Sequence, residues 1–391
     1  MLDNRRNDPA PFVSLLAAVE QAYLRNLPPA WNRRPRAAVV SPEGIIVAAS
    51  EPCEAISMQA LVHGMRAFFG DDWNAGDVAL TNDVYSGASH ATEFAALAPL
   101  FRPDGDLQGW LGIRALFPDV GGWDLGSYSL RALDIWSEGV RIVPVKLARQ
   151  GVARREIIQI LRLNSRTPRL TEACARSLLA AVAEASQVRL STGGSINVEN
   201  FVSATVSDIR SRAGAFLREL PAGRRLGEAR VPIPAEASVA IKVEVESGQG
   251  GLKISFPETP PARELPLNTT RWLTSDAVLR AVAGHFDLDD GAILGLAGSL
   301  DIQIPDNSML AVTDVLPVGH GRHVVCDAVE AAVRSALEEL VPSSREPRRV
   351  PGEGGFVPAL NASLGTLDTQ EQRLLLNIEK SLEIQNDPAA V

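Results

Sequence analysis

The chain has 391 residues, 46% of them hydrophobic, which is enough to bury large cores in two or three folding units. Its net charge of −9 gives no long-range attraction to phosphate backbones or anionic lipids, so nucleic acid and membrane surfaces are poor partners. The three cysteines are widely spaced, and no export signal or run of about 18 apolar residues occurs, so we expect a cytoplasmic protein without disulfides.

Helical and strand patterns alternate over the first third of the chain. Apolar side chains recur at helical spacing over residues 12–27 and 55–69, and each stretch predicts an amphipathic helix. Between them, a Ser-Pro-Glu-Gly turn at 41–44 separates two short apolar runs, which predicts a β-hairpin. Further strand patterns follow, at 77–80, 93–101 and 110–117. The polar residues from 82 to 119 are therefore expected to lie at a sheet.

The middle of the chain contains helices followed by a hairpin. Helical spacing recurs at 152–164 and at 171–190. A Ser-Thr-Gly-Gly-Ser stretch at 191–195 comes next and is the clearest candidate for a domain boundary. Further on, apolar and polar residues alternate on both sides of a glycine-rich turn, which predicts a hairpin over 239–256.

The last part of the sequence predicts two helices separated by a loop. The first helix is expected at 327–341, with Asp327 as its N-cap and Glu330 as the capping-box partner. Residues 342–368 are rich in Pro, Gly, Ser and Arg, which is typical of a loop or linker. The second helix is expected at about 370–384.

Together these patterns predict an α+β fold, because strands and helices are interspersed without the regular alternation of a parallel βαβ sheet. We expect mixed or antiparallel sheets with packed helices, in two lobes plus a C-terminal helical tail. Residues 1–190 are the predicted N-terminal lobe and carry the candidate motifs. Residues 196–342 are the predicted second lobe, and residues 343–391 the linker and C-terminal helix.

Candidate metal ligands gather in the polar segment between the predicted strands. They are one imidazole and three carboxylates, from His90, Asp83, Glu93 and Asp119. Such oxygen and nitrogen donors suit a divalent cation. The spacing fits equally well with a loop histidine bonded to the backbone among solvated carboxylates. The glycines after Asp119 permit either a close ligand approach or a simple turn at the end of a strand.

A second candidate metal site lies near the predicted helix at 327–341. His320, His323 and Cys326 have a spacing that could ligate zinc. The alternative is a loop followed by a buried helical cysteine, which is a common environment for this residue. The sequence contains no P-loop, no dinucleotide-binding glycine motif and no nucleophile elbow, so it indicates no nucleotide site of its own.

Four short motifs occur in a fixed order along the chain. They read Asn-Asp-Val-Tyr-Ser-Gly-Ala-Ser-His-Ala-Thr-Glu at 82–93, Arg-Ala-Leu-Phe-Pro-Asp-Val-Gly-Gly at 114–122, Glu-Gly-Val-Arg-Ile-Val-Pro-Val-Lys-Leu at 138–147 and Asn-Ser-Arg-Thr-Pro at 164–168. These motifs resemble those of the B-type subunits of ATP-dependent hydantoinases, oxoprolinases and acetone or acetophenone carboxylases. A weaker likeness runs from about residue 12 to 342, and the chain is short for this family.

The resemblance implies roles for particular residues. A divalent metal, such as Zn, Mn or Mg, would be held by His90, Glu93 and Asp119. Catalysis, if the chain is active, would involve Asp83, His90 and Asp119. Substrate contacts would come from the remaining motif positions, Asn82, Arg114, Arg141 and Lys146; the basic ones, with Arg166, could equally form structural ion pairs.

The sequence departs from the family pattern at the expected metal ligands. Leu116 and Phe117 stand where the family has a His-His pair, and neither side chain has a lone pair to offer a metal. Glu93 stands where aspartate is usual. The segment 52–57, which carries a histidine in the family, has none here. These differences predict a degenerate metal site.

The resulting hypothesis is a subunit of a hetero-oligomeric ATP-dependent complex of the hydantoinase, oxoprolinase or ketone carboxylase type. Its expected partner is an A-type subunit, which carries the ATP site, and a full-length B-type subunit is a second candidate partner. The sequence favours a structural or regulatory role over a catalytic one. Two alternatives remain: a catalytic B-type subunit that works with a reduced metal site, and a module that binds a small ligand without turnover.

Overall fold

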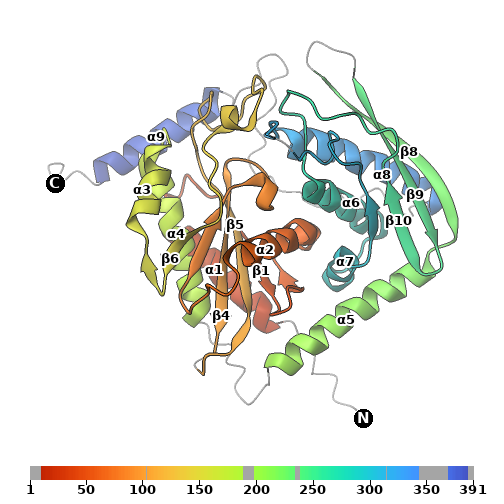
Figure 1. Ribbon diagram of the computed structural model, residues 1–391, viewed down its shortest axis with the longest axis horizontal. Helices are drawn as coiled ribbons and strands as arrows, with labels where there is room; N and C mark the ends of the chain where they lie inside the picture. Colours follow the sequence, from red (N-terminus) through yellow and green to blue (C-terminus); the bar gives the residue numbers. More distant parts are fainter. Residues whose placement is uncertain are drawn as a thin grey trace. The chain divides into compact units, whose positions relative to one another are not determined.

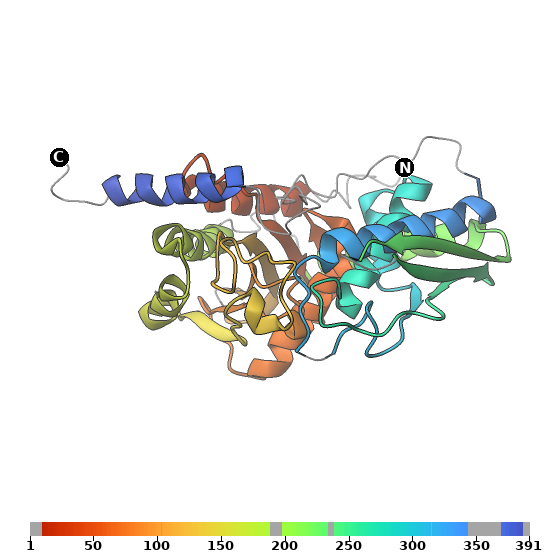
Figure 2. The same cartoon turned by 90° about the horizontal axis from the view of Figure 1, so that it is seen from above.

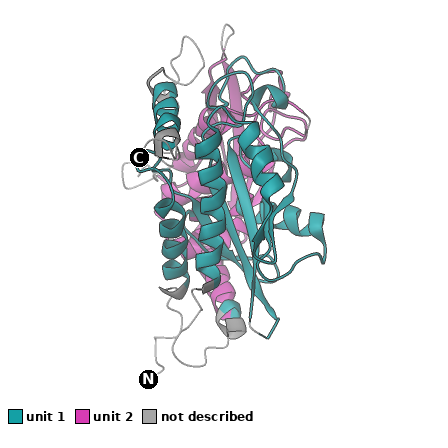
Figure 3. Cartoon of the chain, turned by 90° about the vertical axis from the view of Figure 1, so that its left-hand side faces the viewer, with its two compact units in different colours: residues 1–51, 58–203, 358–391 teal, residues 52–57, 204–357 magenta. Residues whose placement is uncertain are grey.

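The computed structural model describes residues 10–102, 104–187, 198–233, 238–313, 315–342 and 369–385. The chain forms two compact units, which Figure 3 shows in different colours. Unit 1 comprises residues 1–51, 58–203 and 358–391, and unit 2 comprises residues 52–57 and 204–357. The predicted boundary at 191–195 and nearly all of the predicted loop at 342–368 lie outside the described residues. None of the described helices combines the length and apolar content needed to cross a bilayer.

Unit 1 is built on an antiparallel sheet whose strand order is β2-β1-β5-β4-β3-β6-β7. The strands are β1 (Arg36–Val40), β2 (Ile46–Ala49), β3 (Val78–Thr81), β4 (Glu93–Phe101), β5 (Leu107–Leu116), β6 (Val145–Arg149) and β7 (Val152–Ala153). Most residues of β3, β4 and β5 are buried, because helices cover both faces of the sheet. The long β4–β5 pair therefore forms the centre of unit 1 (Figure 1).

Helices cover the two faces of this sheet. They are α1 (Ala10–Arg25), α2 (Ala55–Phe69), α3 (Arg155–Leu163), α4 (Pro168–Gln187) and α9 (Thr369–Gln385). Helices α1 and α4 pack together on one face, and α2 lies on the other, as Figures 1 and 2 show. Gly112 of β5 faces α2, and a Cβ atom there would lie 2.8 Å from Met58 Sδ, so glycine leaves room for this side chain. The first three residues of α2 are assigned to unit 2.

The C-terminal helix α9 docks on α4 through a capping carboxylate. Glu379 accepts hydrogen bonds from the backbone N–H groups of Arg169 (2.9 Å) and Leu170 (3.0 Å) in the first turn of α4. These are donors that the helix itself cannot satisfy. Leu375 and Ile378 are buried on the same helix as Glu379. A polar cap and an apolar contact thus join segments that lie about 200 residues apart in the chain.

We expect Glu379→Ala to lower the free energy of unfolding by about 1 kcal/mol, because it removes the acceptor for two N–H groups at the start of α4. The matched control is Lys380→Ala, an exposed neighbour on α9, which should change it by less than about 0.5 kcal/mol. Urea denaturation of the full chain measures both. Equal effects of the two substitutions would show that the cap does not contribute.

Unit 2 contains a smaller sheet covered by helices. Its strands are ordered β11-β10-β9-β8, namely β8 (Gly223–Val231), β9 (Val239–Gly248), β10 (Gly251–Ser255) and β11 (Asp301–Gln303). Its helices are α5 (Val198–Glu219, from residue 204 onward), α6 (Arg271–Phe286), α7 (Asp290–Ala297) and α8 (Cys326–Leu340). Helix α8 packs on β8 and β9, and α6 packs on α8. A Cβ at position 227 would come within 2.1 Å of the Ala332 carbonyl oxygen, so this contact requires glycine.

The α+β class and most predicted elements are confirmed. The expected helix at 152–164 is partly wrong, because residues 152–153 form strand β7 and α3 begins at Arg155. The expected N-cap at Asp327 is also wrong. Helix α8 begins at Cys326 and continues directly from a π-helical turn, Gly321–Val325, so no capping position exists there. Glu330 instead pairs with Arg280 (2.5 Å).

Candidate functional site

Asn82 follows β3 and joins two loops of unit 1. Its side-chain carbonyl accepts from the Ile142 N–H (2.7 Å), and its amide donates to the carbonyls of Ala91 (2.7 Å) and Val140 (2.8 Å). The side chain is buried, so these bonds replace those it would make with water. Asn82 therefore holds the loop after β3 against the segment around 140–142.

Asp83, the next residue, forms an ion pair with Arg141. Its carboxylate caps a 3₁₀ turn, Val84–Ser86, and accepts from Ser86 Oγ (2.6 Å) and from Arg141 Nε (2.5 Å). The Arg141 guanidinium also lies over the Tyr85 ring, 4.7 Å from its centroid. Two of the predicted site residues, Asp83 and Arg141, are thus brought together as partners of each other.

His90 is buried in the loop before β4, and its ring is hydrogen-bonded on both sides. Nδ1 lies 2.9 Å from the Thr92 hydroxyl, and Nε2 lies 3.1 Å from the Tyr128 hydroxyl. Tyr128 is itself buried, with its ring centroid 5.4 Å from that of His90. The imidazole is therefore engaged by two hydroxyl groups.

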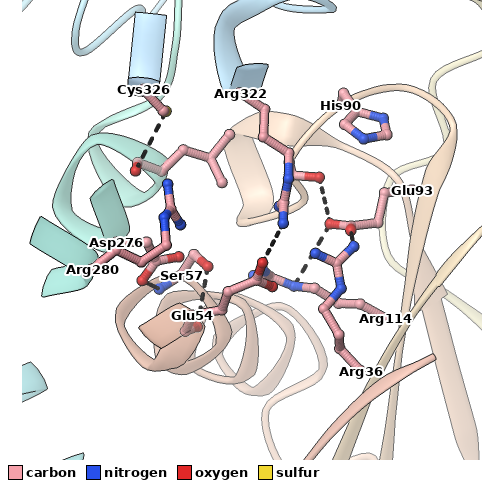
Figure 4. Close-up of polar contacts among 12 residues, drawn as sticks. Arg36, Glu54, Ser57, His90, Glu93, Arg114, Asp276, Arg280, Arg322 and Cys326 are labelled. Atoms are coloured by element: carbon pink, nitrogen blue, oxygen red, sulfur yellow. Dashed lines mark hydrogen bonds and ion pairs between the residues drawn. The ribbon is translucent and has the colours of Figure 1, made fainter. Parts of the chain in front are cut away.

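Glu93 begins β4 and is fully buried beside two arginines. Its carboxylate pairs with Arg36 through Oε1, while Oε2 accepts from Ser89 Oγ and lies 3.9 Å from Arg114 Nε. Arg114 is also fully buried and donates to the Gly87 carbonyl (3.0 Å). Figure 4 shows Glu93 between the two guanidinium groups. Both of its oxygens thus have cationic or hydroxyl partners.

Asp119 follows β5 and organises the glycine-rich loop. One oxygen accepts from the N–H groups of Gly121 (3.1 Å) and Arg166 (2.8 Å), and the other from the Gly126 N–H (2.8 Å) and Arg166 Nη1 (2.9 Å). Gly121 and Gly126 have φ angles of 87° and 84°, which an L side chain rarely adopts. The carboxylate is fully buried and is the centre around which this loop folds.

We expect Asp119→Asn to lower the free energy of unfolding by about 2–3 kcal/mol. The asparagine amide keeps one acceptor oxygen, but its NH₂ group replaces the oxygen that accepts two of the four hydrogen bonds. Two buried donors then lose their acceptor, and each such loss costs about 1–3 kcal/mol. Urea denaturation measures the change. Asp104→Asn, in an exposed turn, is the matched control and should stay within about 0.5 kcal/mol of the parent. Comparable losses in both variants would contradict this role.

Leu116 and Phe117 stand at the positions where the resemblance places two histidines. Phe117 is buried, its ring centroid lies 4.3 Å from that of Phe94, and its N–H donates to the Thr92 carbonyl (2.8 Å). Leu116 ends β5 opposite Glu93. These positions therefore continue the apolar core and the backbone hydrogen bonding of the sheet.

The segment 52–57, which belongs to unit 2, is held by two carboxylates. Asp276 of α6 accepts from the N–H groups of Ile56 and Ser57, both at 3.1 Å, and so caps the first turn of α2. Glu54 pairs with Arg322 (Figure 4). The two carboxylates thus fix the segment at the start of α2.

The donor set does not fit a divalent metal. The described part of the chain contains no group of three or more His, Cys, Asp or Glu side chains that could hold one. The predicted ligands His90, Glu93 and Asp119 instead bond hydroxyls, backbone N–H groups and arginines. The second predicted site, of His320, His323 and Cys326, likewise does not form such a group among the described residues. Burial lowers the pKa of His320 to about 4 and raises the pKa of the Cys326 thiol to about 11.

Lys146, a predicted substrate contact, lies in a buried ion pair. Its ammonium donates to Asp77 Oδ2 (3.0 Å) and to the Asp72 carbonyl (2.6 Å), and it lies 3.7 Å from the centroid of the Trp73 ring. Burial by itself raises the pKa of Asp77. Hydrogen bonds from the N–H groups of Gln150 and Asn74, together with Lys146, outweigh it and leave this pKa below its usual value.

The lowered pKa of Asp77 predicts a pH-dependent stability. The unfolded chain binds this proton at a pH near 4, whereas the folded chain binds it only at lower pH. The stabilisation is therefore complete above about pH 4 to 5 and is lost as the pH falls through the folded pKa. We expect the stability difference between the parent and Asp77→Asn to shrink on acidification. Urea denaturation from pH 7 to pH 3 measures it, with exposed Asp71→Asn as the matched control.

The sequence did not identify several residues that complete these clusters. Arg36 lies in a strand read only as apolar, and Tyr128 lies outside the motifs. Ser89 and Thr92 fall inside a motif but have no assigned role there. Each becomes a partner only because of strand register or loop closure, which a single sequence does not display.

The fold is an antiparallel α+β unit whose loops are held by buried carboxylates, joined in one chain to a second α+β unit. The sequence profile described as Hydantoinase B/oxoprolinase matches residues 35–377. The chain belongs to the hydantoinase B/oxoprolinase family, as the four motifs indicated.

Relatives and solved structures agree with this assignment. The chain is 25% identical over 334 residues to the caprolactamase subunit beta of Pseudomonas jessenii, which covers 82% of this chain and 55% of that one. The crystal structure of the ATP-dependent caprolactamase from Pseudomonas jessenii matches its fold with a TM-score of 0.73 and 21% identity, over 86% of this chain and 61% of that one. A nucleotide-free acetone carboxylase structure matches with a TM-score of 0.70 and 17% identity, over 87% and 49%. The chain spans about half the length of the first curated relatives it matches.

Proposed function

We propose that this chain is a structural or regulatory subunit, with a degenerate metal site, of an ATP-dependent complex of the hydantoinase, oxoprolinase or ketone carboxylase type. The observation that carries the proposal is the pairing of Glu93 with Arg36 and Arg114, at a position that the resemblance assigns to a metal ligand. The neighbouring positions 116 and 117 hold apolar side chains. The family assignment supports the rest of the proposal.

Electrostatics argue against a cation at Glu93. Two unit charges about 4 Å apart interact by about 4 kcal/mol at an effective dielectric constant of 20, and a divalent ion doubles this figure. A divalent metal bound to Glu93 would therefore be repelled by about 8 kcal/mol by a guanidinium about 4 Å away on the same carboxylate. It would also gain nothing from Leu116 or Phe117, which have no lone pairs to donate.

The proposed partners follow from the relatives. The similar caprolactamase chain is named a beta subunit, and the matching caprolactamase structure is described as ATP-dependent. Applied to this chain, these descriptions support a complex with an A-type subunit that binds ATP. A full-length B-type subunit is the second proposed partner. ATP would then bind only to the A-type partner.

The rival proposal is a catalytic subunit with a reduced site. It is supported by the contact between His90 and Tyr128, because an imidazole and a phenol 3.1 Å apart can pass a proton between them. In this proposal Asp83, His90 and Asp119 would retain catalytic roles. The structural proposal assigns His90 no contact with a substrate.

Metal and turnover assays of the purified complex separate the two proposals. The chain is co-expressed with candidate A-type and full-length B-type subunits, as the parent and as His90→Ala. Exposed His63→Ala, on α2, is the matched control. We expect unchanged complex assembly, metal content and ATP-dependent turnover in both variants. Loss of stoichiometric metal or of turnover in His90→Ala, but not in His63→Ala, would establish the catalytic alternative.

A further inference from the structure

We propose that Arg36 and Arg114 serve as built-in cations of unit 1: they hold the buried Glu93 carboxylate and so fix the loop 87–92 without any metal ion. This inference goes beyond the proposed function, because the loop needs a fixed conformation whether or not the chain turns over a substrate. It concerns three charged side chains from three neighbouring strands of the sheet.

Strand register brings these side chains to one face of the sheet. Arg36 of β1 lies opposite Arg114 of β5, and Arg114 lies opposite Ala95 of β4. Side chains two positions apart on a strand point to the same face, so Glu93 shares the face of Ala95. The cluster therefore forms on the face covered by α2, at the end where β4 begins.

Burial explains why the carboxylate needs these partners. The side chains of Glu93 and Arg114 are 0% exposed and that of Arg36 is 11% exposed. A carboxylate removed from water is stable only when other charges and donors replace its hydration. Here Oε1 bonds Arg36, while Oε2 bonds Ser89 and faces Arg114.

The same cluster secures the loop. Arg114 donates to the Gly87 carbonyl (3.0 Å), and Ser89 donates to Glu93. The backbone N–H of Glu93 donates to the His90 carbonyl (3.0 Å). Gly87 has a φ of 102°, and a Cβ there would lie 2.7 Å from the Leu61 backbone, so the loop passes tightly over α2. Both the beginning and the end of the loop depend on the Glu93 cluster.

A guanidinium differs from a metal ion in one decisive way. It is covalently attached and stays charged at every physiological pH, so it cannot be removed by a chelator. The loop that carries His90 should accordingly be insensitive to divalent metals. The planar guanidinium also offers several donors, whereas lysine offers a compact point charge.

The test compares Arg36→Met with Arg34→Met. Arg34 is 73% exposed and pairs with Glu20 at the surface, so its loss is a matched control for removing an arginine from the same segment. Stability is measured by urea denaturation and thermal unfolding of the full chain. Amide hydrogen exchange of residues 87–92, read by mass spectrometry, reports the loop itself. The parent is measured with EDTA and with added MnCl₂ or ZnCl₂.

We expect Arg36→Met to lower the ratio of folded to unfolded chain by about 100-fold, because the buried Glu93 carboxylate then keeps only Ser89 and the more distant Arg114 as partners. Exchange in residues 87–92 should rise in this variant, while Arg34→Met should resemble the parent. The parent should keep its melting temperature and its exchange rates in EDTA and in added metal. The triple variant Arg36→Met/Glu93→Leu/Arg114→Met removes all three charges of the cluster and should recover most of the lost stability.

Arg36→Lys and the triple variant keep the test decisive if Arg36→Met does not fold. Arg36→Lys retains the charge without the planar fork, so it should fall between Arg36→Met and the parent. The proposal is overturned if the parent loses stability or loop protection in EDTA, or gains either in added metal. It is also overturned if the Arg36 variants behave like Arg34→Met, or if the triple variant is no more stable than Arg36→Met. A metal effect on the parent would also contradict the degenerate metal site of the proposed function, whereas the Arg36 variants test the present proposal alone. Complex assembly and turnover are not measured, so the proposed role as a subunit stands or falls separately.

Discussion

A carboxylate cannot be buried without partners, and this constraint shapes the loops of unit 1. Four loop or strand-end carboxylates are each at most 3% exposed, and each has its own basic side chain. The pairs are Asp77 with Lys146, Asp83 with Arg141, Glu93 with Arg36 and Arg114, and Asp119 with Arg166. Every pair joins segments distant in sequence, so the same ion pairs that neutralise the charges also decide which loops meet at the sheet.

The pairing also decides what these carboxylates can do chemically. An acidic group already neutralised by a fixed arginine has little affinity left for a free cation, whatever its spacing from a histidine. The chain thus matches the profile of its family, while the oxygens of its loop carboxylates serve internal partners. Retained architecture is in this case weak evidence for retained chemistry.

Local periodicity predicted much of the fold, but the partners within the site depended on register. Helices α1 and α2 and the strands β4 and β5 show regular apolar spacing over many residues, and their predicted bounds nearly match. Helix α5 was not predicted, although its buried apolar residues recur at helical spacing, namely Val202, Val206, Ile209, Ala213 and Leu217. Arg36 and Glu93 are 57 residues apart, and only the β1–β5–β4 pairing brings them together. No single-sequence pattern encodes that distance.

The spacing of His90 and Glu93 suggested shared ligation, whereas the fold sends the two side chains to different partners. His90 bonds Tyr128, 38 residues away, while Glu93 bonds Arg36. Because residues 116 and 117 are apolar, they offer no metal-binding group beside Glu93. Without an arginine, the Glu93 carboxylate would therefore be a buried and unpaired charge. Arg36 removes that problem, so the apolar pair and the arginine are physically coupled features. Restoring histidines at 116 and 117 alone would therefore not restore a metal site while Arg36 occupies the carboxylate.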